Sequence, residues 1–365
     1  MAKCKLKDLS LSKLEYGSGA AACAFDGNVR YVRITDITDD GSLSSDIVSP
    51  SYYEEKHVLQ DGDILFARTG ATVGKTFLYR NKYGKCVYAG FLIRMVPDRS
   101  IVLPDYIYYF TKSPRYRDFV AANMKVVAQP NINAKQYGDL EIDVPSFAEQ
   151  KEVVGRLAKI EGLIALRKEQ LAKLDQLVKS QFIELFGDPI INSNNLPTER
   201  MELRFNLKAG ITTAADDIHE FEEGMYEIPC YGGNGIRGYV REKSYTGNYP
   251  IIGRQGALCG NVQYATGEFH ATEHAVLVSL LKNDNSVWVY HLLKLMDLFR
   301  YHTGAAQPGL AVKTLNTVEV IVADKSKQDQ FAAFVEQTDK SKFDLKQSLE
   351  KLEMLKKSLM QEYFG

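Results

Sequence analysis

The chain has 365 residues, of which 45% are hydrophobic and 25% are charged. This length exceeds that of an ordinary single domain and allows two globular cores. The composition is that of an average soluble protein, with no signal-like N-terminus and no apolar run of about eighteen residues, so we expect a cytoplasmic protein outside the membrane. The formal net charge of −1 gives no global attraction to nucleic acid. The five cysteines are widely spaced without a C-x-x-C pair, which indicates neither a disulfide framework nor a zinc knuckle.

The first half of the chain predicts a mixed α/β region in which strands dominate. Residues 62–67 read as a short apolar strand that runs into a glycine turn, R-x-G-A-x-x-G, at residues 68–74. A helical stretch is expected at 105–110, and it leads toward an A-Q-P turn at 128–130.

The glycine turn comes within one residue of a nucleotide-binding P-loop. Residues 69–76 satisfy G-x-x-x-x-G-K-[ST] except at the first position, where Thr69 replaces glycine. The following residues, Phe77-Leu-Tyr, favour a strand over the helix that a P-loop requires. A second copy of this turn, at residues 254–260, is not followed by a Lys-Thr pair. We therefore interpret the feature that both copies share as a backbone turn, and Lys75 as a candidate phosphate contact.

A proline-free segment at 149–186 predicts a long helix. Its apolar residues recur in alternating steps of three and four, as in a heptad seam. The seam consists of Val153, Leu157, Ile160, Ile164, Leu171, Leu174, Val178 and Leu185. Arg167 and Gln181 occupy two further seam positions, and the helix would be about 57 Å long. Because Gly155 and Gly162 weaken an isolated helix, we expect a partner helix.

The second half of the chain repeats the first. Residues 128–187 align without a gap onto 306–365, and 17 of the 60 aligned pairs are identical, against about four expected by chance. The glycine turn recurs at 254–260, after a predicted strand at 249–253. We therefore expect two similar globular domains, each followed by a long helix.

The C-terminal helix carries the same seam as the central one. Its apolar seam residues are Phe331, Val335, Leu345, Leu349, Leu352 and Leu359, and Thr338 and Lys342 weaken its middle. Two equivalent helices in one chain pack most naturally antiparallel about a pseudo-two-fold axis, as a coiled coil. The expected division is a first domain at 1–147, a central helix at 148–187, a second domain at 188–325 and a C-terminal helix at 326–365.

Residues 270–274 match H-x-x-E-H, a zinc-protease signature that requires a helix to bring both histidines to one face. The sequence after it, Ala275-Val-Leu-Val-Ser, favours a strand, where positions four apart are too distant to share one ion. We therefore predict no metal site. Methyltransferase chemistry would need a glycine-rich cofactor loop and an Asn-Pro-Pro-aromatic element, and the sequence contains neither.

These features together resemble the specificity subunit of type I restriction-modification enzymes along essentially the whole chain. The resemblance rests on GDILFARTG at 62–70, YGGNGIRGY at 231–239, GRQGALCG at 253–260, the Gln-Pro turns and LFGDP at 185–189. It implies two target-recognition domains that each read half of a bipartite site in double-stranded DNA, with the helices as spacer. It also implies two methyltransferase subunits as partners and allows for motor-nuclease subunits. S-adenosylmethionine, and ATP with Mg²⁺ where a nuclease is present, would then belong to the partners, leaving this chain without cofactor, metal or catalytic residue.

DNA contact calls for polar side chains on loops that can reach a groove. In the first domain the candidates are Arg68, Thr69, Thr72, Lys75, Lys112, Arg115, Arg117, Gln129, Asn131, Asn133 and Lys135. In the second domain they are Asn234, Arg237, Arg254, Gln255, Arg300, His302, Gln307 and Lys313. Residues shared by both halves, such as Arg68 and Arg254, are poor candidates for reading different sequences and fit phosphate contacts or turn stabilisation better. Unshared residues, including Asn131, Asn133, Asn234 and Arg237, are better candidates for bases.

Two functions of other classes compete with DNA recognition. The first is a protein-binding scaffold in which a coiled coil holds two recognition domains that do not bind DNA. The second is a P-loop NTPase, which nucleotide binding would reveal.

Overall fold

The computed structural model describes residues 2–124, 130–304 and 308–365. The chain forms two compact units, Met1–Arg167 with Ser348–Gly365 (unit 1) and Lys168–Gln347 (unit 2). Each unit contains one globular head and one end of each of the two long helices. We call residues 2–146 head 1 and residues 187–324 head 2.

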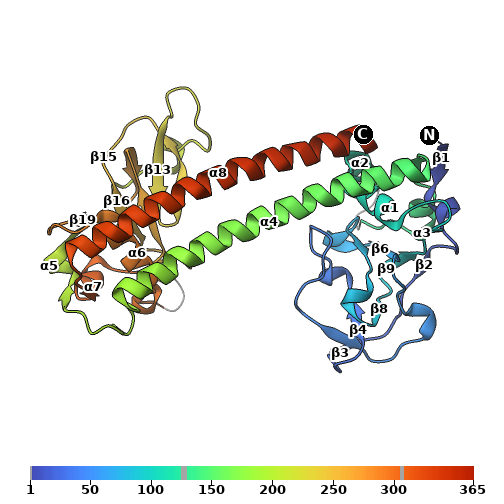
Figure 1. Ribbon diagram of the computed structural model, residues 1–365, viewed down its shortest axis with the longest axis horizontal. Coiled ribbons are helices and arrows are strands. Elements are labelled where there is room, and N and C mark those ends of the chain that lie inside the picture. The colour runs from blue at the N-terminus through green and yellow to red at the C-terminus, as the bar shows by residue number, and fades with distance from the viewer. Residues whose placement is uncertain (1, 125–129, 305–307) are drawn as a thin grey trace. The chain divides into compact units, whose positions relative to one another are not determined.

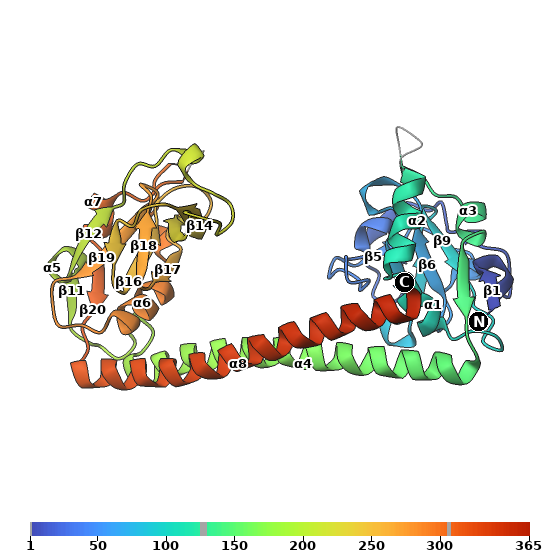
Figure 2. The same ribbon diagram turned by 90° about the horizontal axis from the view of Figure 1, so that it is seen from above.

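Head 1 is built on a four-stranded antiparallel sheet in the order β2-β9-β6-β7, of which Figure 2 labels the two central strands, β9 and β6. Three two-stranded sheets accompany it, β1-β10, β3-β5 and the parallel pair β4-β8. The strands are β1 (Ala2–Lys5), β2 (Glu15–Tyr16), β3 (Ala22–Ala24), β4 (Arg30–Val32), β5 (Val48–Pro50), β6 (Ile64–Ala67), β7 (Thr76–Leu78), β8 (Cys86–Tyr88), β9 (Leu92–Met95) and β10 (Glu141–Val144). The helices are α1 (Pro104–Phe110), α2 (Pro114–Met124), α3 (Ala134–Gly138) and the 3-10 turns η1 (Leu6–Leu9), η2 (Ile34–Asp36), η3 (Glu55–His57), η4 (Gly70–Thr72) and η5 (Asn81–Tyr83).

Head 2 contains two four-stranded sheets, β12-β19-β16-β17 and β14-β13-β18-β15, and the pair β11-β20. The strands are β11 (Thr198–Arg200), β12 (Phe205–Ala209), β13 (Ile228–Gly232), β14 (Gly235–Val240), β15 (Tyr245–Thr246), β16 (Tyr249–Gly253), β17 (Val262–Ala265), β18 (Glu268–Ala271), β19 (Ala275–Leu280) and β20 (Glu319–Ile321). The helices are α5 (Met201–Arg204), α6 (Ser286–Leu295), α7 (Val312–Asn316) and the 3-10 turns η6 (Ala215–Asp217) and η7 (Leu298–Tyr301).

The two heads share one topology. The sheet β2-β9-β6-β7 of head 1 corresponds strand for strand to β12-β19-β16-β17 of head 2. The parallel pair β4-β8 likewise corresponds to the parallel pair β13-β18. Both heads are therefore mixed α/β folds, as the repeat in the sequence predicts.

The long helices are α4 (Phe147–Phe186) and α8 (Lys325–Phe364), each beginning and ending one residue before the predicted bounds. In unit 1 they run antiparallel, because Glu161 pairs with Lys356 at 2.7 Å and Arg156 donates to the Tyr363 hydroxyl at 3.1 Å (Figure 1). In unit 2 they are also antiparallel, because Asp175 pairs with Lys342 at 2.8 Å and the Phe182 ring, further along α4, lies 5.3 Å from Phe331, earlier in α8. Every predicted seam residue is buried or half-buried.

Each unit ties the beginning of one long helix to its head through a buried glutamine. In unit 1 Gln150 accepts from the Leu103 backbone N–H at 2.8 Å, immediately before α1. In unit 2 Gln328 accepts from the Asn285 N–H at 2.7 Å, immediately before α6. A buried amide that bonds backbone groups on a separate element fixes the angle at which the helix leaves the head. This contact explains why Gln150 and Gln328 are identical in the repeat.

The other end of each helix is anchored by an aromatic side chain. Phe364 of α8 lies 5.1 Å from the ring of Tyr106 in unit 1, and Phe186 of α4 lies 5.7 Å from the ring of Trp288 in unit 2. Both phenylalanines are almost completely buried in the core of the respective unit. Each helix therefore begins on one head and ends in the core of the other.

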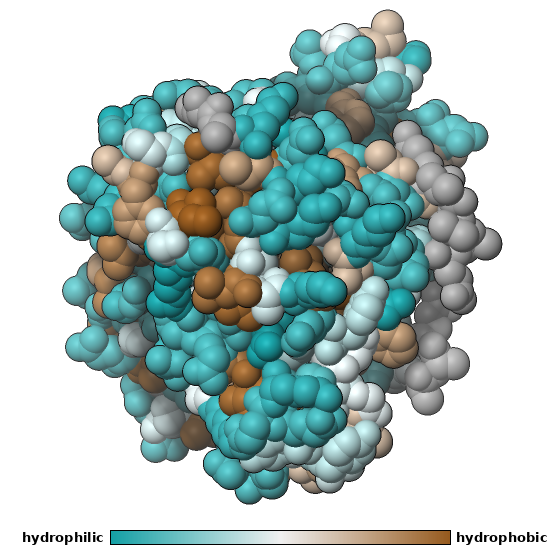
Figure 3. Space-filling view, turned by 90° about the vertical axis from the view of Figure 1, so that its right-hand side faces the viewer, coloured by the Kyte–Doolittle hydropathy of each residue, from teal (hydrophilic) through white to brown (hydrophobic). Residues whose placement is uncertain are grey.

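Among the described residues, none of the helices has the length and apolar character that crossing a membrane requires. The face of the molecule in Figure 3 is mostly hydrophilic, with small hydrophobic groups between the polar ones.

Candidate nucleic-acid interface

The two glycine turns have the same backbone conformation. Gly70 and Gly256 have φ of +74° and +78°, and Gly74 and Gly260 both have φ of +84°. Residues with a Cβ rarely adopt this left-handed region, which is why glycine is retained at all four positions. The second glycine of each turn donates its N–H to the end of the preceding strand, which closes the loop.

In both heads this turn lies against the segment that follows the Gln-Pro pair. The Arg68 carbonyl accepts from Ile132 at 2.9 Å, and the Arg254 carbonyl accepts from Leu310 at 2.8 Å. The fold thus brings together two motifs that are about 60 residues apart in head 1. The predicted contacts Gln129 and Gln307 lie outside the described residues.

The turn and this segment place several head 1 candidates side by side. Arg68 donates from Nε to the Asn131 side chain at 3.3 Å, and its guanidinium carbon lies 4.7 Å from the centre of the Tyr16 ring. Thr69 forms a bridge with Asn131, and Thr72 donates to the Thr69 carbonyl at 3.4 Å. Tyr16 is not among the residues that the sequence singles out, because its place beside Arg68 depends on the pairing of β2 with β9.

Two lysines of head 1 are already engaged by the protein. Lys75 pairs with Asp39 at 2.8 Å and donates to the Ile37 carbonyl at 3.3 Å. Lys112 points to the Thr76 carbonyl, and its amine lies 4.7 Å from the ring centre of Tyr108. These partners do not forbid a phosphate contact, but they make both lysines less available than exposed ones.

The buried ammonium of Lys112 makes the stability of the fold depend on pH. Burial lowers its pKa to about 8, with Lys356 and Lys75 adding repulsion that Asp40 and Glu161 oppose. Between this value and the ordinary pKa of 10.5 the unfolded chain binds more protons, so folding becomes more favourable as pH rises. We expect Lys112→Met to be more stable than wild type at pH 7, with a higher midpoint of unfolding. This difference in stability should shrink between pH 8 and pH 10.5. A pH-independent difference would contradict this.

A second group of head 1 candidates lines one open depression of about 760 Å³. It contains Arg115 of α2, Asn133 and Lys135. Arg115 pairs with Asp143 at 2.6 Å, and Asn133 caps α3 by accepting from the Gln136 N–H at 2.9 Å. Lys135 is exposed, as is Arg117 elsewhere on α2.

In head 2 the candidates are distributed over several loops. Asn234 sits on the turn between β13 and β14 and accepts a hydrogen bond from Asn261, and Arg237 is exposed on β14. Arg254 is half-buried, and its Nε has no hydrogen-bond partner among the described residues. Gln255 is exposed and bridges to Gly309.

The remaining head 2 candidates lie near the end of the head's sequence. Arg300 stacks on the Tyr301 ring at 4.8 Å, and the His302 ring stacks on Phe299 at 4.3 Å. Lys313 is exposed on α7.

The P-loop-like residues and the H-x-x-E-H residues adopt the backbone that the sequence favours. After the P-loop-like residues the chain enters strand β7, not a helix, so the N–H groups of a helix N-terminus are not aimed at a phosphate. The H-x-x-E-H residues end β18 and begin the turn to β19. His270 bonds to Thr213 at 2.8 Å while His274 pairs with Glu273 at 3.1 Å. No cluster of three metal-ligating side chains occurs among the described residues.

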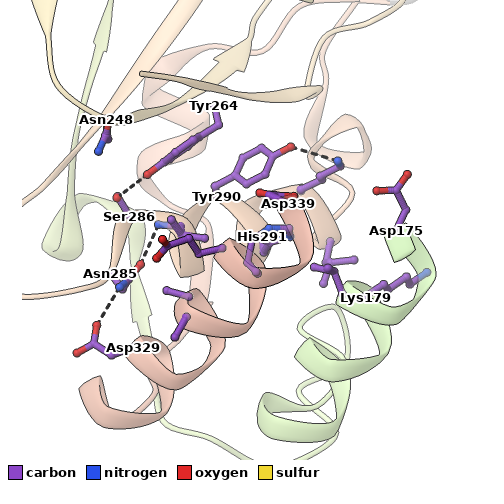
Figure 4. A pocket seen from close by; sticks show the side chains of 18 of the residues that line it. Asp175, Lys179, Asn248, Tyr264, Asn285, Ser286, Tyr290, His291, Asp329 and Asp339 are labelled. Carbon is purple, nitrogen blue, oxygen red and sulfur yellow. Dashed lines mark hydrogen bonds between the residues drawn. The ribbon is translucent and has the colours of Figure 1, made fainter. Parts of the chain in front are cut away.

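A separate pocket of about 970 Å³ lies in unit 2 between α6 and the long helices (Figure 4). Its wall contains a hydrogen bond between the hydroxyls of Tyr264 and Ser286 at 2.7 Å, and Asn285 donates to Asp329 at 2.8 Å. Burial lowers the pKa of His291 to about 3, so this imidazole is neutral at physiological pH. None of the predicted DNA contacts lines this pocket, which belongs to the junction of head and helices.

Comparison with known proteins places these features in a family. The family model for the "Type I restriction modification DNA specificity domain" matches residues 3–176 and 205–356. The chain is 40% identical over 205 residues to the type I restriction enzyme EcoprrI specificity subunit of Escherichia coli, covering 53% of this chain and 49% of that protein. It is 27% identical over 163 residues to a putative type I restriction enzyme MjaX specificity subunit of Methanocaldococcus jannaschii, covering 42% and 38%. The matches thus span about half or less of the length of these relatives.

Solved structures show the same fold. The type I restriction-modification S subunit from M. genitalium superimposes with a TM-score of 0.64 at 17% identity, over 100% of this chain and 96% of the other. A chain from a study of complex assembly in the type I R-M system gives a TM-score of 0.60 at 14% identity, over 100% and 97%. Since the family model covers most of both halves, this chain belongs to the family of type I restriction-modification DNA specificity domains.

Proposed function

We propose that this chain is the specificity subunit of a type I restriction-modification complex, in which each head binds one half of a bipartite DNA sequence. The target-recognition domains would be residues 1–147 and 188–325. The observation that carries this proposal is the duplication of one loop, the glycine turn against the post-Gln-Pro segment, on two heads of one topology. Two equivalent loops surrounded by different polar residues suit the reading of two different half-sites.

Shared and unshared residues would have different tasks at the DNA. A phosphate is present at every step of a duplex, so a contact to it can be the same in both heads. A base contact must differ wherever the half-sites differ. We therefore propose Asn131, Asn133, Asn234 and Arg237 for bases, and the exposed lysines Lys135 and Lys313 for phosphates.

The helices at 148–187 and 326–365 would form a coiled coil that sets the number of unread base pairs between the half-sites. Helices of 40 residues are about 60 Å long, which is compatible with one or two turns of DNA. The antiparallel contacts of the helices within each unit and the repeated seam support this role. They also support the proposed pseudo-two-fold symmetry. The spacing itself depends on how the complex holds the DNA.

The methyltransferase subunits would dock on this chain and supply the reaction. Large apolar side chains remain exposed on the long helices, at Leu166, Leu177, Phe343 and Met354. Contiguous apolar surface is typical of a face that a partner covers, and we propose that these side chains belong to such a face. In this proposal the chain is non-catalytic, and S-adenosylmethionine, and ATP with Mg²⁺ where motor-nuclease subunits join, belong to the partners.

Lengthening the helices tests the spacer proposal. We would insert one heptad after Arg167 in α4 and one after Gln347 in α8, where the two units meet and the seam phase is preserved. Each insertion adds about 10 Å, so we expect modification to move to sites whose spacer is longer by about three base pairs, with both half-sites unchanged. Sequencing of methylated sites in cells that express the chain with its methyltransferase would measure this.

Two controls make the test specific. A heptad in α4 alone destroys the pairing register and should abolish modification at every spacing. A double insertion that still modifies only the original spacing would refute the spacer role. The alternative of a protein-binding scaffold predicts no salt-dependent affinity for duplex DNA even with the methyltransferase present, whereas DNA recognition predicts a linear fall of log K with log salt.

A further inference from the structure

The arginine shared by the two glycine turns has different surroundings in the two heads. In head 1, β9 residue Ile93 lies opposite both Tyr16 and Phe66. In head 2, β19 residue Val276 lies opposite both Ala209 and Ile252. Since the sheets have the same strand order, Tyr16 and Ala209 occupy equivalent positions. At the position where head 1 has the Tyr16 ring, head 2 thus has the methyl group of Ala209.

The second neighbour of the arginine differs as well. Asn131, which accepts from Nε of Arg68, aligns with Gly309 in the repeat. Gly309 has no side chain, and Nε of Arg254 is buried without a partner among the described residues. The arginine is common to both heads, but among the described residues only Arg68 of head 1 has a side-chain hydrogen bond and a ring contact.

The contacts of head 1 fix both the plane and the direction of the Arg68 guanidinium. The Tyr16 ring lies 4.7 Å from its carbon, and the Tyr16 hydroxyl is itself held by the Ala134 N–H at 3.1 Å. Nε is used by Asn131, which leaves the two terminal nitrogens. Within the described ranges these nitrogens make no hydrogen bond or ion pair. A planar fork with two parallel N–H groups, held before the ligand arrives, is the geometry that recognises two acceptors side by side.

We propose that Arg68 reads a guanine in the half-site bound by head 1, donating to O6 and N7 in the major groove, and that Tyr16 is its positioning residue. This inference rests on the proposed function. A phosphate can accept from the same fork. Phosphates are present in both half-sites, however, and head 2 retains the arginine without the Tyr16 ring and the Asn131 side chain. Base recognition in head 1 therefore explains why Tyr16 and Asn131 hold Arg68 there.

The test uses the full chain assembled with its methyltransferase subunits and a library of duplexes with randomised half-sites, sequenced after binding selection. Wild type should select guanine at one position of the head 1 half-site. Arg68→Ala and Arg68→Lys should both reduce discrimination at that position by about tenfold or more, since lysine keeps the charge but loses the fork. Tyr16→Ala should relax the same position, and Tyr16→Phe should retain it because the ring remains.

The outcomes separate a base contact from a phosphate contact. Arg99→Ala, which removes an exposed arginine of the same head, should leave the selected base unchanged. If Arg68→Ala weakens binding equally for all sequences, lowers the salt slope by about one and leaves the base profile intact, Arg68 contacts phosphate and the inference is wrong. A wild-type complex that selects no sequence would instead refute the proposed function, which these variants do not address.

Discussion

Replacing Phe186 by alanine is expected to destabilise unit 2 by about 3–5 kcal/mol, the cost of truncating a fully buried aromatic side chain. Phe186 is 1% exposed, and its ring lies 5.0 Å from Phe182, 5.7 Å from Trp288 and 5.9 Å from Phe331. It therefore joins α4 to both α6 and the beginning of α8. Its removal leaves a cavity where three elements meet and cannot easily collapse.

Hydrogen exchange of the full chain measures this effect unit by unit, which matters because a protein of two units need not unfold in one step. In Phe186→Ala the amides of α6 should lose protection while those of α1 keep theirs. The repeat offers the mirror experiment, because Phe364→Ala should expose α1 and leave α6 protected. Ile183→Ala, one turn before Phe186 but partly exposed, is the matched control and should cost far less. Equal loss of protection in both units would contradict the separate anchoring of the two helix ends.

Replacing Asp284 by valine is expected to cost about 3–5 kcal/mol, because it leaves a buried guanidinium without its main partner. Arg204 donates to both carboxylate oxygens of Asp284, through Nε at 3.1 Å and through Nη2. The side chains are 8% and 2% exposed, and Gln328 donates to the same carboxylate at 2.9 Å. Of the ion-pair partners of Arg204 in the described part of the chain, Glu199 would remain, at 3.2 Å and 41% exposed.

The double variant Arg204→Leu with Asp284→Val should regain most of this loss. Head 1 shows that the position tolerates an apolar pair, because Leu9 and Val102 stand at the equivalent places and are 1% and 0% exposed. A buried ion pair replaced by apolar groups of similar volume is often neutral or stabilising, since no desolvated charge remains. Hydrogen exchange of the amides of unit 2 in the single and double variants measures both effects. Glu268→Ala, which breaks an exposed pair with Lys243, is a control of small expected cost. A double variant as unstable as Asp284→Val would show that the charges themselves are needed.

The sequence by itself determined the architecture, because the repeat is an internal comparison. The constant offset over residues 128–187 predicted two similar heads and two long helices, and the predicted seam residues are buried or half-buried. The strand after the P-loop-like residues and the strand after H-x-x-E-H also followed from local composition. The long helices and these strands depend on short-range periodicity and on residue types, which a sequence displays directly.

Only the tertiary structure shows which side chains stand together at the proposed interface. Tyr16, Arg68 and Asn131 are spread over more than 100 residues, and the pairing of β2 with β9 and of β6 with β9 makes them neighbours. The sequence alone could not separate Arg68 from Arg254, because the motif around them is the same. Their difference lies in what a distant strand contributes next to each turn, Tyr16 of β2 in head 1 and Ala209 of β12 in head 2, and which distant strands pair is a property of the tertiary fold.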